Sequence, residues 1–350
     1  MGPQDISIAV LCPSEIARRR FLPALSSVPG VRYAGIGVAT KEERKVENAG
    51  DDQALQDRVD RQRDLAVQTQ AEFGGTIWES FQDLIESPEV DAVYIPLPPA
   101  LHAYWAEKAL CAGKHVMMEK PFTTSFSDAE KLVSISEDRN LAVHENYMFA
   151  FHSQIEYLCE KMSDGSLGDL RLIRIDFGFP FRGANDFRYS AALGGGSLLD
   201  CGGYALKLAS MLLGPTAELE TSSLSYGRGL EVDLFGSATL ENDQGLVAQV
   251  SFGMDNDYRC DVDVWGSEAT LYSGRILTAP CGFSPTFEIR RNGEVEKITL
   301  RPDDSFAKSI AHFLECINSR DLAQSQRNEI LVQSRLVEAC LGRAKAIREP

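Results

Sequence analysis

The first third of the chain alternates short apolar runs with stretches of helical periodicity. The apolar runs predict strands at 6–11, 32–39, 91–95, 115–119 and 141–144. Helices are predicted between them at 15–25, 100–112 and 125–138. Strands joined by helices in this way are typical of a parallel sheet with crossover helices. We therefore expect an α/β, doubly wound (Rossmann) dinucleotide-binding domain at residues 1–145, with ligands at the carboxyl ends of its strands.

One part of this domain, from Lys41 to Gly74, is unusually polar, and residues 52–72 have a helical register. A thin apolar stripe follows that register, made of Leu55, Val59, Ala66 and Phe73. So narrow a stripe predicts a long, partly solvated helix. A surface elaboration is the favoured interpretation, and a lid over a cofactor is the alternative.

After about residue 150 the apolar runs become longer and few helical stretches separate them. They predict strands at 171–179, 218–226, 232–240, 246–252, 259–265 and 287–300, followed by helices at 305–317 and 326–348. Consecutive strands favour a largely antiparallel open sheet. We expect an α+β domain at residues 146–350, whose exposed sheet face would be a natural dimer surface.

The composition narrows the classes of function. No run approaches the roughly 18 apolar residues that span a bilayer, and a net charge of −16 repels phosphate backbones and anionic lipids. We expect no nucleic-acid partner, no membrane partner and, without a visible signal segment, a cytoplasmic protein. Eight cysteines and five histidines are dispersed along the chain without the close pairs of zinc or redox sites, which predicts reduced thiols and no metal.

The turn after the first strand is a candidate pyrophosphate site. Aligned to the pattern G-x-G-x-x-[GA], its three positions hold Cys12, Ser14 and Ala17, of which only Ala17 fits. Small side chains still permit close backbone approach, but Pro13 removes one N–H from a phosphate cradle. The candidate cofactor contacts are Cys12, Pro13, Ser14, Glu15 and Ile16. An ordinary strand-to-helix turn without a ligand fits the same residues equally well.

The end of the second strand bears on the choice of cofactor. It runs out as Val38-Ala39-Thr40-Lys41, without the carboxylate that binds the ribose 2′-hydroxyl of NAD. Lys41 and Arg44 could instead bind a 2′-phosphate, which favours NADP(H), with NAD(H) possible. Thr40, Lys41 and Arg44 are therefore candidate cofactor residues. The alternative is that these bases only begin a solvated helix.

Two later strands end in residues suited to the nicotinamide. Strand 91–95 stops against three prolines, so Leu97, Pro98 and His102 can contact the ring, although a plain helix start is the alternative. The next strand ends in Glu119-Lys120-Pro121, which puts a lysine at the same edge, before a proline that can be cis. A lysine directly after an apolar run is seldom a packing choice.

A glycine-rich turn at Leu193–Gly196 is predicted to open a helix that carries Asp200 and Tyr204. Residues four apart share a helical face. Gly202 and Gly203 would leave room for a ligand beside that face, because glycine costs about 1 kcal/mol in a helix and needs a reason to be there. The alternative is a capped helix with a buried tyrosine.

Together, Glu119-Lys120-Pro121, Leu193–Gly196 and Asp200-x-Gly202-x-Tyr204 resemble the Gfo/Idh/MocA oxidoreductase superfamily over nearly the whole chain. Residues 96–102, 145–149, 152–154 and 186–188 look most like its nucleotide-sugar 3-ketoreductases. The resemblance implies Lys120 and Tyr204 as the catalytic pair, with Asp200 orienting them or the substrate. It also implies cofactor contacts from Glu119, Lys120 and Asn146, substrate contacts from Tyr147, Phe149, Arg188, Asp200 and Tyr204, and a homodimer or homotetramer.

The hypothesis is therefore an NADP(H)-dependent reduction of a keto group on a sugar or nucleotide sugar. Tyr204 would give a proton to the developing alkoxide, and Lys120 would hydrogen-bond the same oxygen. An NADP-dependent dehydrogenase of a free sugar, polyol or dihydrodiol is one alternative. A non-catalytic, cofactor-sensing homologue is another, because Cys12 and Pro13 alter the phosphate turn.

Overall fold

The structure, a computed structural model, describes residues 5–44, 52–183, 186–227 and 229–348. These residues form two compact units. The N-terminal unit comprises the described parts of 1–146 and 306–331, and the C-terminal unit comprises those of 147–305 and 332–350. The chain first passes from the N-terminal to the C-terminal unit after Asn146, one residue from the expected boundary at 145. Residues 306–331 then return to the N-terminal unit. Part of the predicted polar segment, residues 45–51, lies outside the described residues.

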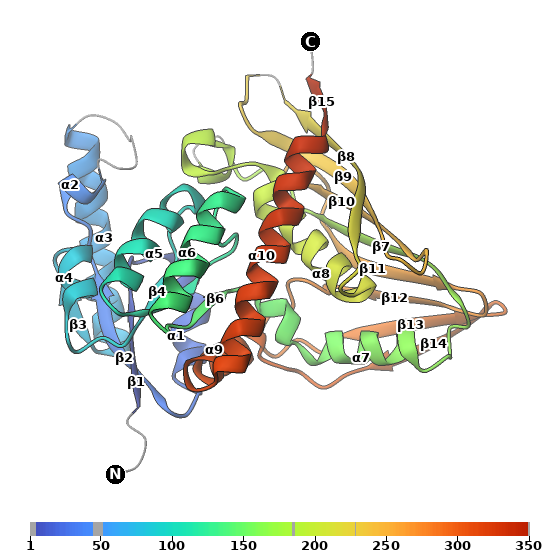
Figure 1. The fold of residues 1–350 in the computed structure, drawn as a ribbon, viewed down its shortest axis with the longest axis horizontal. Coiled ribbons are helices and arrows are strands. Elements are labelled where there is room, and N and C mark those ends of the chain that lie inside the picture. The colour runs from blue at the N-terminus through green and yellow to red at the C-terminus, as the bar shows by residue number, and fades with distance from the viewer. Residues whose placement is uncertain (1–4, 45–51, 184–185, 228, 349–350) are drawn as a thin grey trace. The chain divides into compact units, whose positions relative to one another are not determined.

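The N-terminal unit contains a six-stranded sheet in the order β3-β2-β1-β4-β5-β6 (Figure 1). The strands are β1 (Ile6–Val10), β2 (Val31–Gly37), β3 (Thr76–Trp78), β4 (Ala92–Ile95), β5 (His115–Met118) and β6 (Val143–Glu145). All five pairings are parallel, so the predicted Rossmann sheet is confirmed. The strand order reverses between β1 and β4, where such sheets bind ligands at their carboxyl ends.

The helices of this unit alternate with its strands along the chain, as expected. They cover the sheet, which is why its strands are apolar. They are η1 (Ala17–Phe21), α1 (Leu22–Leu25), α2 (Lys41–Arg44), α3 (Asp52–Phe73), α4 (Phe81–Glu86), η3 (Pro99–Leu101), α5 (His102–Cys111), α6 (Phe126–Asp138) and α9 (Ser305–Asn318). Every residue of β4 is buried, as expected for a central parallel strand covered by helices. Val93 and Val116 of the sheet share a core with Ala106 of α5 and Leu132 of α6.

The C-terminal unit contains a nine-stranded sheet in the order β14-β13-β12-β11-β7-β10-β9-β8-β15. Its strands are β7 (Leu170–Gly178), β8 (Glu218–Tyr226), β9 (Asp233–Glu241), β10 (Val247–Gly253), β11 (Arg259–Gly266), β12 (Thr270–Gly274), β13 (Thr286–Arg291), β14 (Glu294–Thr299) and β15 (Lys345–Arg348). Only β10/β7 and β15/β8 pair in parallel. The predicted α+β domain with a largely antiparallel sheet is confirmed.

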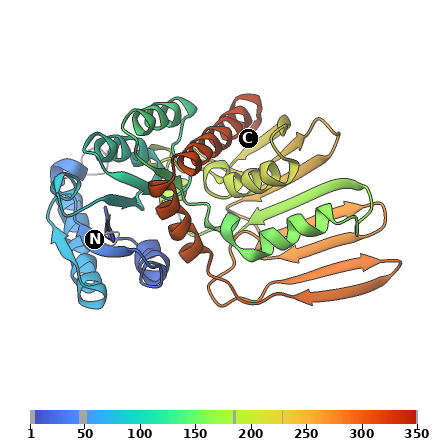
Figure 2. The same ribbon diagram turned by 60° about the horizontal axis from the view of Figure 1, so that its bottom comes forward.

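Helices cover one face of this sheet, as Figure 2 shows for α7 (Ser153–Ser163) and α8 (Gly203–Leu213). α8 packs on β7, β9 and β10, and Tyr157 of α7 packs on Phe287 of β13 with ring centroids 4.8 Å apart. The last helix, α10 (Arg320–Arg343), belongs to this unit from residue 332. On the other face, which the described residues leave open, Phe235 and Trp265 are 47% and 52% exposed.

Several predicted boundaries were wrong. Residues 287–300 were expected to form one strand but form the hairpin β13–β14, which turns at Asn292 and Gly293, both with positive φ. α10 begins at Arg320 instead of 326, and the residues expected to end it form β15.

None of the helices in the described ranges is long and apolar enough to cross a membrane. Within the same ranges, no three His, Cys, Asp or Glu side chains are grouped so as to hold a metal ion.

Candidate active site

The turn after β1 carries the candidate pyrophosphate contacts. Cys12 is buried, and its Sγ accepts a hydrogen bond from the Gln62 amide of α3 at 2.8 Å. Ser14 Oγ accepts from the backbone N–H of Ala17 at 3.2 Å, which caps the helix that starts at Glu15. With this N–H occupied and none on Pro13, the turn offers an anion fewer backbone donors than a glycine-rich one.

Downstream of β2, Thr40 and Glu43 form a capping box. Thr40 Oγ1 accepts from the Glu43 N–H at 3.2 Å, and Glu43 Oε2 accepts from the Thr40 N–H at 2.8 Å. The same carboxylate accepts from the N–H groups of Phe81 and Gln82, at the start of α4. Sequence reasoning missed Glu43, although the pattern T-x-x-E at 40–43 could have found it.

The neighbouring bases differ in exposure: Lys41 is partly exposed, whereas Arg44 is buried at 6%. Both are on α2 and thus at the edge of the sheet where β2 ends. Lys41 is therefore the more accessible of the two cations expected to bind a 2′-phosphate.

The loop after β5 holds Lys120 beside a partly buried carboxylate. Glu119 Oε1 accepts from Tyr94 OH at 2.6 Å and from Asn146 Nδ2 at 2.7 Å. Burial raises the pKa of Glu119, and the bonds from Tyr94 and Asn146 oppose that shift. The Lys120–Pro121 peptide is cis, which confirms the expectation from the sequence. Lys120 thus sits at the carboxyl end of a central strand, in a loop fixed on both sides.

His102, at the start of α5, lies behind this loop and is fully buried. Its Nδ1 lies 2.7 Å from the Pro121 carbonyl and its Nε2 lies 2.7 Å from the Leu97 carbonyl. Burial lowers the pKa of His102 to about 4, against the effect of the two carbonyls. The expectation that His102 contacts the nicotinamide is wrong, because its ring is fully buried between two carbonyls. His102 instead joins the two loops expected to contact the nicotinamide, and Leu97 and Pro98 belong to the first of them.

In the C-terminal unit, the glycine turn opens a helix as predicted. Gly194 and Gly196 have φ of 76° and 119°, and a Cβ on Gly196 would lie 2.5 Å from Asp233 Oδ1. Asp233 of β9 accepts from Ser197 Oγ at 2.5 Å and from the Leu198 N–H at 2.8 Å, which caps the helix. Burial raises the pKa of Asp233. This cap fixes where the helix begins, and therefore the residues it carries.

The first turn of that helix, η7 (Leu198–Gly202), is a π-helix and carries Asp200. Asp200 Oδ2 accepts from Arg188 Nε at 2.6 Å, and Arg188 also bonds Asp186. Burial lowers the pKa of Arg188, but the two carboxylates outweigh it and raise the pKa overall. Two predicted substrate residues, Arg188 and Asp200, thus form one ion pair.

Tyr204 lies in the first turn of α8 among aromatic rings and is 7% exposed. Its ring meets Tyr147 edge-on at 5.1 Å, and Phe149 and Phe177 lie 5.8 Å and 5.4 Å away. Tyr147 is buried, and its hydroxyl accepts from Gln333 Nε2 at 3.3 Å. The predicted substrate residues Tyr147 and Phe149 therefore pack against the predicted catalytic tyrosine.

The expectation that Gly202 and Gly203 leave room for a ligand is wrong. A Cβ on Gly202 would lie 3.1 Å from the Phe252 ring, and one on Gly203 would lie 2.3 Å from Tyr147 OH. Both glycines are buried. They admit neighbouring side chains of the protein instead of a ligand, because the sequence did not reveal which strands pack on this helix.

Family comparison now identifies the chain. The oxidoreductase family with an NAD-binding Rossmann fold, Gfo/Idh/MocA, matches residues 31–147, and the Gfo/Idh/MocA C-terminal domain matches residues 155–272. The chain belongs to the Gfo/Idh/MocA oxidoreductase family. The predicted resemblance is confirmed, and so is the class of enzyme.

Relatives within the Gfo/Idh/MocA family align along almost the whole chain. A dTDP-3,4-didehydro-2,6-dideoxy-alpha-D-glucose 3-reductase from Actinomadura kijaniata is 34% identical over 99% of this chain and 97% of its own. A 3-ketoreductase from the same organism, solved with NADP and TDP-benzene, has a TM-score of 0.88 and 33% identity, covering 99% of this chain and 100% of its own. An NADP(+) D-xylose 1-dehydrogenase from Haloferax volcanii is 29% identical over 75% and 81%.

Proposed function

We propose that this enzyme uses NADPH to reduce a keto group on a nucleotide-linked sugar. The observation that carries the proposal is the alignment, over 99% of the chain, with a dTDP-sugar 3-reductase. Lys120 and Tyr204 support it from the residues themselves. Lys120 follows a buried strand at the ligand-binding edge of a Rossmann sheet, and Tyr204 lies in the first turn of a helix, among aromatic rings.

The choice of NADPH has two supports. The related 3-ketoreductase was solved with NADP. In this chain, the four donors around Glu43 are the N–H groups of Thr40, Phe81 and Gln82 and the Ser80 hydroxyl, so its carboxylate is occupied and poorly placed to take a ribose hydroxyl. Lys41 and Arg44 would then hold the 2′-phosphate.

The turn after β1 can hold the pyrophosphate of a dinucleotide, although it offers fewer backbone donors than a glycine-rich turn. The first N–H groups of a helix lack partners within it, so those around Ser14, Glu15 and Ile16 can bind a pyrophosphate. Cys12 and Pro13 would contact the pyrophosphate at the turn where related folds usually have glycine. Leu97, Pro98 and Glu119 would line the nicotinamide end, with the buried Asn146 holding Glu119 from behind.

In the proposed mechanism, bound NADPH supplies the hydride. Tyr204 gives its proton to the developing alkoxide, and the Lys120 ammonium donates a hydrogen bond to the same oxygen. Asp200 and Arg188 orient the sugar as a pair, because each fixes the other at 2.6 Å. Tyr147 and Phe149 hold the Tyr204 ring at a fixed angle.

The decisive experiment follows NADPH oxidation with keto sugars, both free and linked to dTDP. We expect turnover only with the linked sugars. Tyr204→Phe should lose about 100- to 10,000-fold in kcat while its NADPH affinity stays the same. Tyr258→Phe, on an exposed ring of the C-terminal unit, is the matched control and should keep full activity. Unchanged turnover in Tyr204→Phe would refute the assignment.

A second candidate is an NADP-dependent dehydrogenase of a free sugar, polyol or dihydrodiol, which the similarity to the D-xylose dehydrogenase favours. Oxidation of unmodified monosaccharides with NADP would support it. A cofactor-sensing homologue would bind NADPH, seen by its fluorescence, without turning over any of these substrates.

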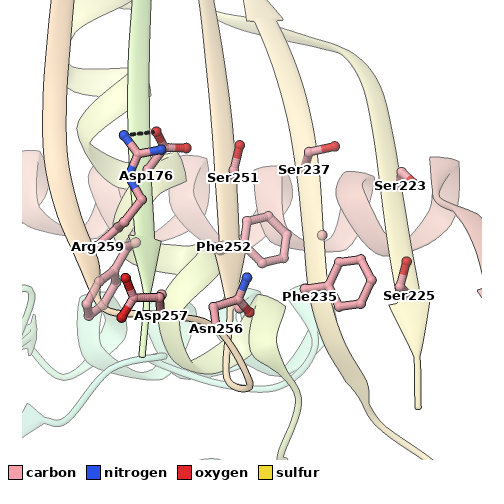
Figure 3. A pocket seen from close by; sticks show the side chains of 14 residues that line it. Asp176, Ser223, Ser225, Phe235, Ser237, Ser251, Phe252, Asn256, Asp257 and Arg259 are labelled. Atoms are coloured by element: carbon pink, nitrogen blue, oxygen red, sulfur yellow. Dashed lines mark ion pairs between the residues drawn. The ribbon is translucent and has the colours of Figure 1, made fainter. Parts of the chain in front are cut away.

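We also propose that the enzyme works in the cytoplasm as a homodimer or homotetramer. The open face of the nine-stranded sheet is the surface that a second copy would cover. Asp176, Ser251, Ser237 and Ser223, on four neighbouring strands, form a polar row there (Figure 3). Arg259 pairs with Asp176 at 2.9 Å beside this row.

A further inference from the structure

A chain of buried polar side chains in the N-terminal unit ends at Glu119. His144 Nε2 lies 2.8 Å from Ser309 Oγ, and Ser309 Oγ lies 2.9 Å from Asn146 Oδ1. Asn146 Nδ2 lies 2.7 Å from Glu119 Oε1. His144, Asn146 and Ser309 are each 0% exposed. The chain thus connects β6 and α9, which are far apart in sequence, to the residue next to Lys120.

The donors in this chain all point toward the carboxylate. Glu119 accepts from the Asn146 amide nitrogen, which leaves the amide oxygen to face Ser309. Ser309 has one hydroxyl proton and gives it to that oxygen, so it must accept from His144 Nε2–H. Hydrogen bonds aligned in this way strengthen one another, and they favour the ionised acceptor at their end.

We propose that Ser309, with His144 behind it, is a positioning residue for Lys120, acting through Asn146 and Glu119. This inference rests on the proposed function for its effect on turnover. Without the Ser309 hydroxyl, the Asn146 amide oxygen loses its donor, and Asn146 becomes a weaker donor to Glu119. The Glu119 carboxylate is then less readily ionised, and the neighbouring Lys120 backbone is held in place less firmly.

A purely structural role explains these contacts less well. Buried polar groups cost free energy unless they are fully satisfied, and an apolar residue on α9 would fill the same space without that risk. α9 already contributes apolar packing at this point, because Phe313 lies 6.0 Å from the His144 ring. The polar chain adds an effect that packing does not supply, namely control of the Glu119 charge.

Other ionisable groups surround the carboxylate and must be kept constant. Those on neighbouring elements are Tyr94 on β4, His102 on α5, Lys120 on the same loop, Glu145 on β6 and His312 on α9. Tyr94 also donates to Glu119 Oε1, at 2.6 Å. The test therefore changes Ser309 or Tyr94 and leaves the rest intact.

The experiment measures the pKa of Glu119 by ¹³C NMR on glutamate-labelled enzyme, assigned by the signal lost in Glu119→Gln. Ser309→Ala should raise that pKa by a few tenths of a unit, because it leaves the Asn146 donor in place and removes only its cooperative strengthening, which is about 10–30% per bond. Its kcat should fall about twofold, and the acid limb of its pH profile should move up by the same few tenths of a unit, with NADPH affinity unchanged. Ser309→Thr keeps the hydroxyl and should restore both properties.

Ser136→Ala is the matched control. Ser136 is also 0% exposed, but its hydroxyl bonds only the Val133 carbonyl within α6. It should lose similar stability without moving the Glu119 pKa. If Ser309→Ala fails to fold, Tyr94→Phe removes a direct donor to Glu119 and should raise that pKa by more, about one unit. An unchanged Glu119 pKa in the folded variant overturns the inference, even if the wild type turns over sugars. Absence of any turnover, with the pKa shifted, overturns only the proposed function.

Discussion

At the scale of single residues, two histidines of the N-terminal unit are held neutral by burial. Burial lowers the pKa of both His102 and His115 to about 4. Each folded pKa lies below the usual 6.5, so the folded state disfavours protonation. Their stabilising effect is therefore present above about pH 6.5 and is lost as the pH falls toward 4.

We expect both rings to remain neutral down to about pH 5, which is one unit above their pKa of about 4. Long-range ¹H–¹⁵N NMR can follow them, because the chain has only five histidines. Denaturant unfolding should show a lower free energy of unfolding at pH 4.5 than at pH 7. Titration of both rings near pH 6.5 would contradict the prediction.

A glycine in α8 gives a second test at this scale. A Cβ at position 203 would lie 2.3 Å from Tyr147 OH, so Gly203→Ala must displace the ring that packs on Tyr204. We expect a loss of about 1–3 kcal/mol in the free energy of unfolding and reduced kcat. Gly342→Ala is the control, because its Cβ would meet nothing within 4 Å. It should be neutral or stabilise by up to about 1 kcal/mol. Equal thermal stability of the two variants would refute the argument.

The residues predicted from sequence and those missed differ in how far away their partners lie. Lys120 and Tyr204 could be proposed from the sequence because each follows a local signal, an apolar strand in one case and a glycine turn in the other. Asp233 and Ser309 were missed because their partners, Ser197 and Asn146, lie 36 and 163 positions away. No local pattern encodes such a contact, so the supporting residues of a site emerge only from the fold.

At the scale of elements, Glu43 stabilises two helices at once. Its carboxylate accepts from Thr40 at the start of α2 and from Phe81 and Gln82 at the start of α4. Charge at a helix N-terminus and satisfied backbone donors both stabilise. We expect Glu43→Ala to lower the free energy of unfolding by about 3 kcal/mol.

Urea unfolding of the isolated variants measures this effect. Glu43→Gln keeps one acceptor oxygen and should lose less than Glu43→Ala. Glu130→Ala, an exposed position of α6, should change stability by less than about 0.5 kcal/mol. If Glu43→Ala behaves like Glu130→Ala, the shared cap contributes nothing.

Helices and strands could be predicted where the apolar pattern extended over many residues. Predictions failed where that pattern was short. The strands of the Rossmann sheet were found from apolar runs, except β3, which has only three residues. α7 was missed because the change to longer strands dominated the pattern there. The hairpin β13–β14 was read as one strand although Asn292-Gly293 is a strong turn signal, because apolar residues continue on both sides of the turn.

At the scale of the whole molecule, the open face of the large sheet is wide enough for a stable dimer. Nine strands at about 4.8 Å spacing and six or so residues of about 3.3 Å give roughly 43 Å by 20 Å. That is about 800–900 Å² on each partner, the size of a standard interface. The face has exposed aromatic rings, Phe235 and Trp265, and a hollow of about 460 Å³ that is lined by the polar row and Phe235.

An isologous contact places each residue opposite its own surface patch, so one substitution acts twice in a dimer. Phe235→Glu combined with Trp265→Glu puts like charges on both partners and removes the aromatic anchors. Light scattering should show the wild type at twice the chain mass of 38.5 kDa, or four times for a tetramer, and the double variant at a smaller mass. Val67→Glu, an equally exposed apolar position in the N-terminal unit, should leave the mass unchanged. A wild type that is monomeric, or a double variant that assembles normally, would show that this face is not the interface.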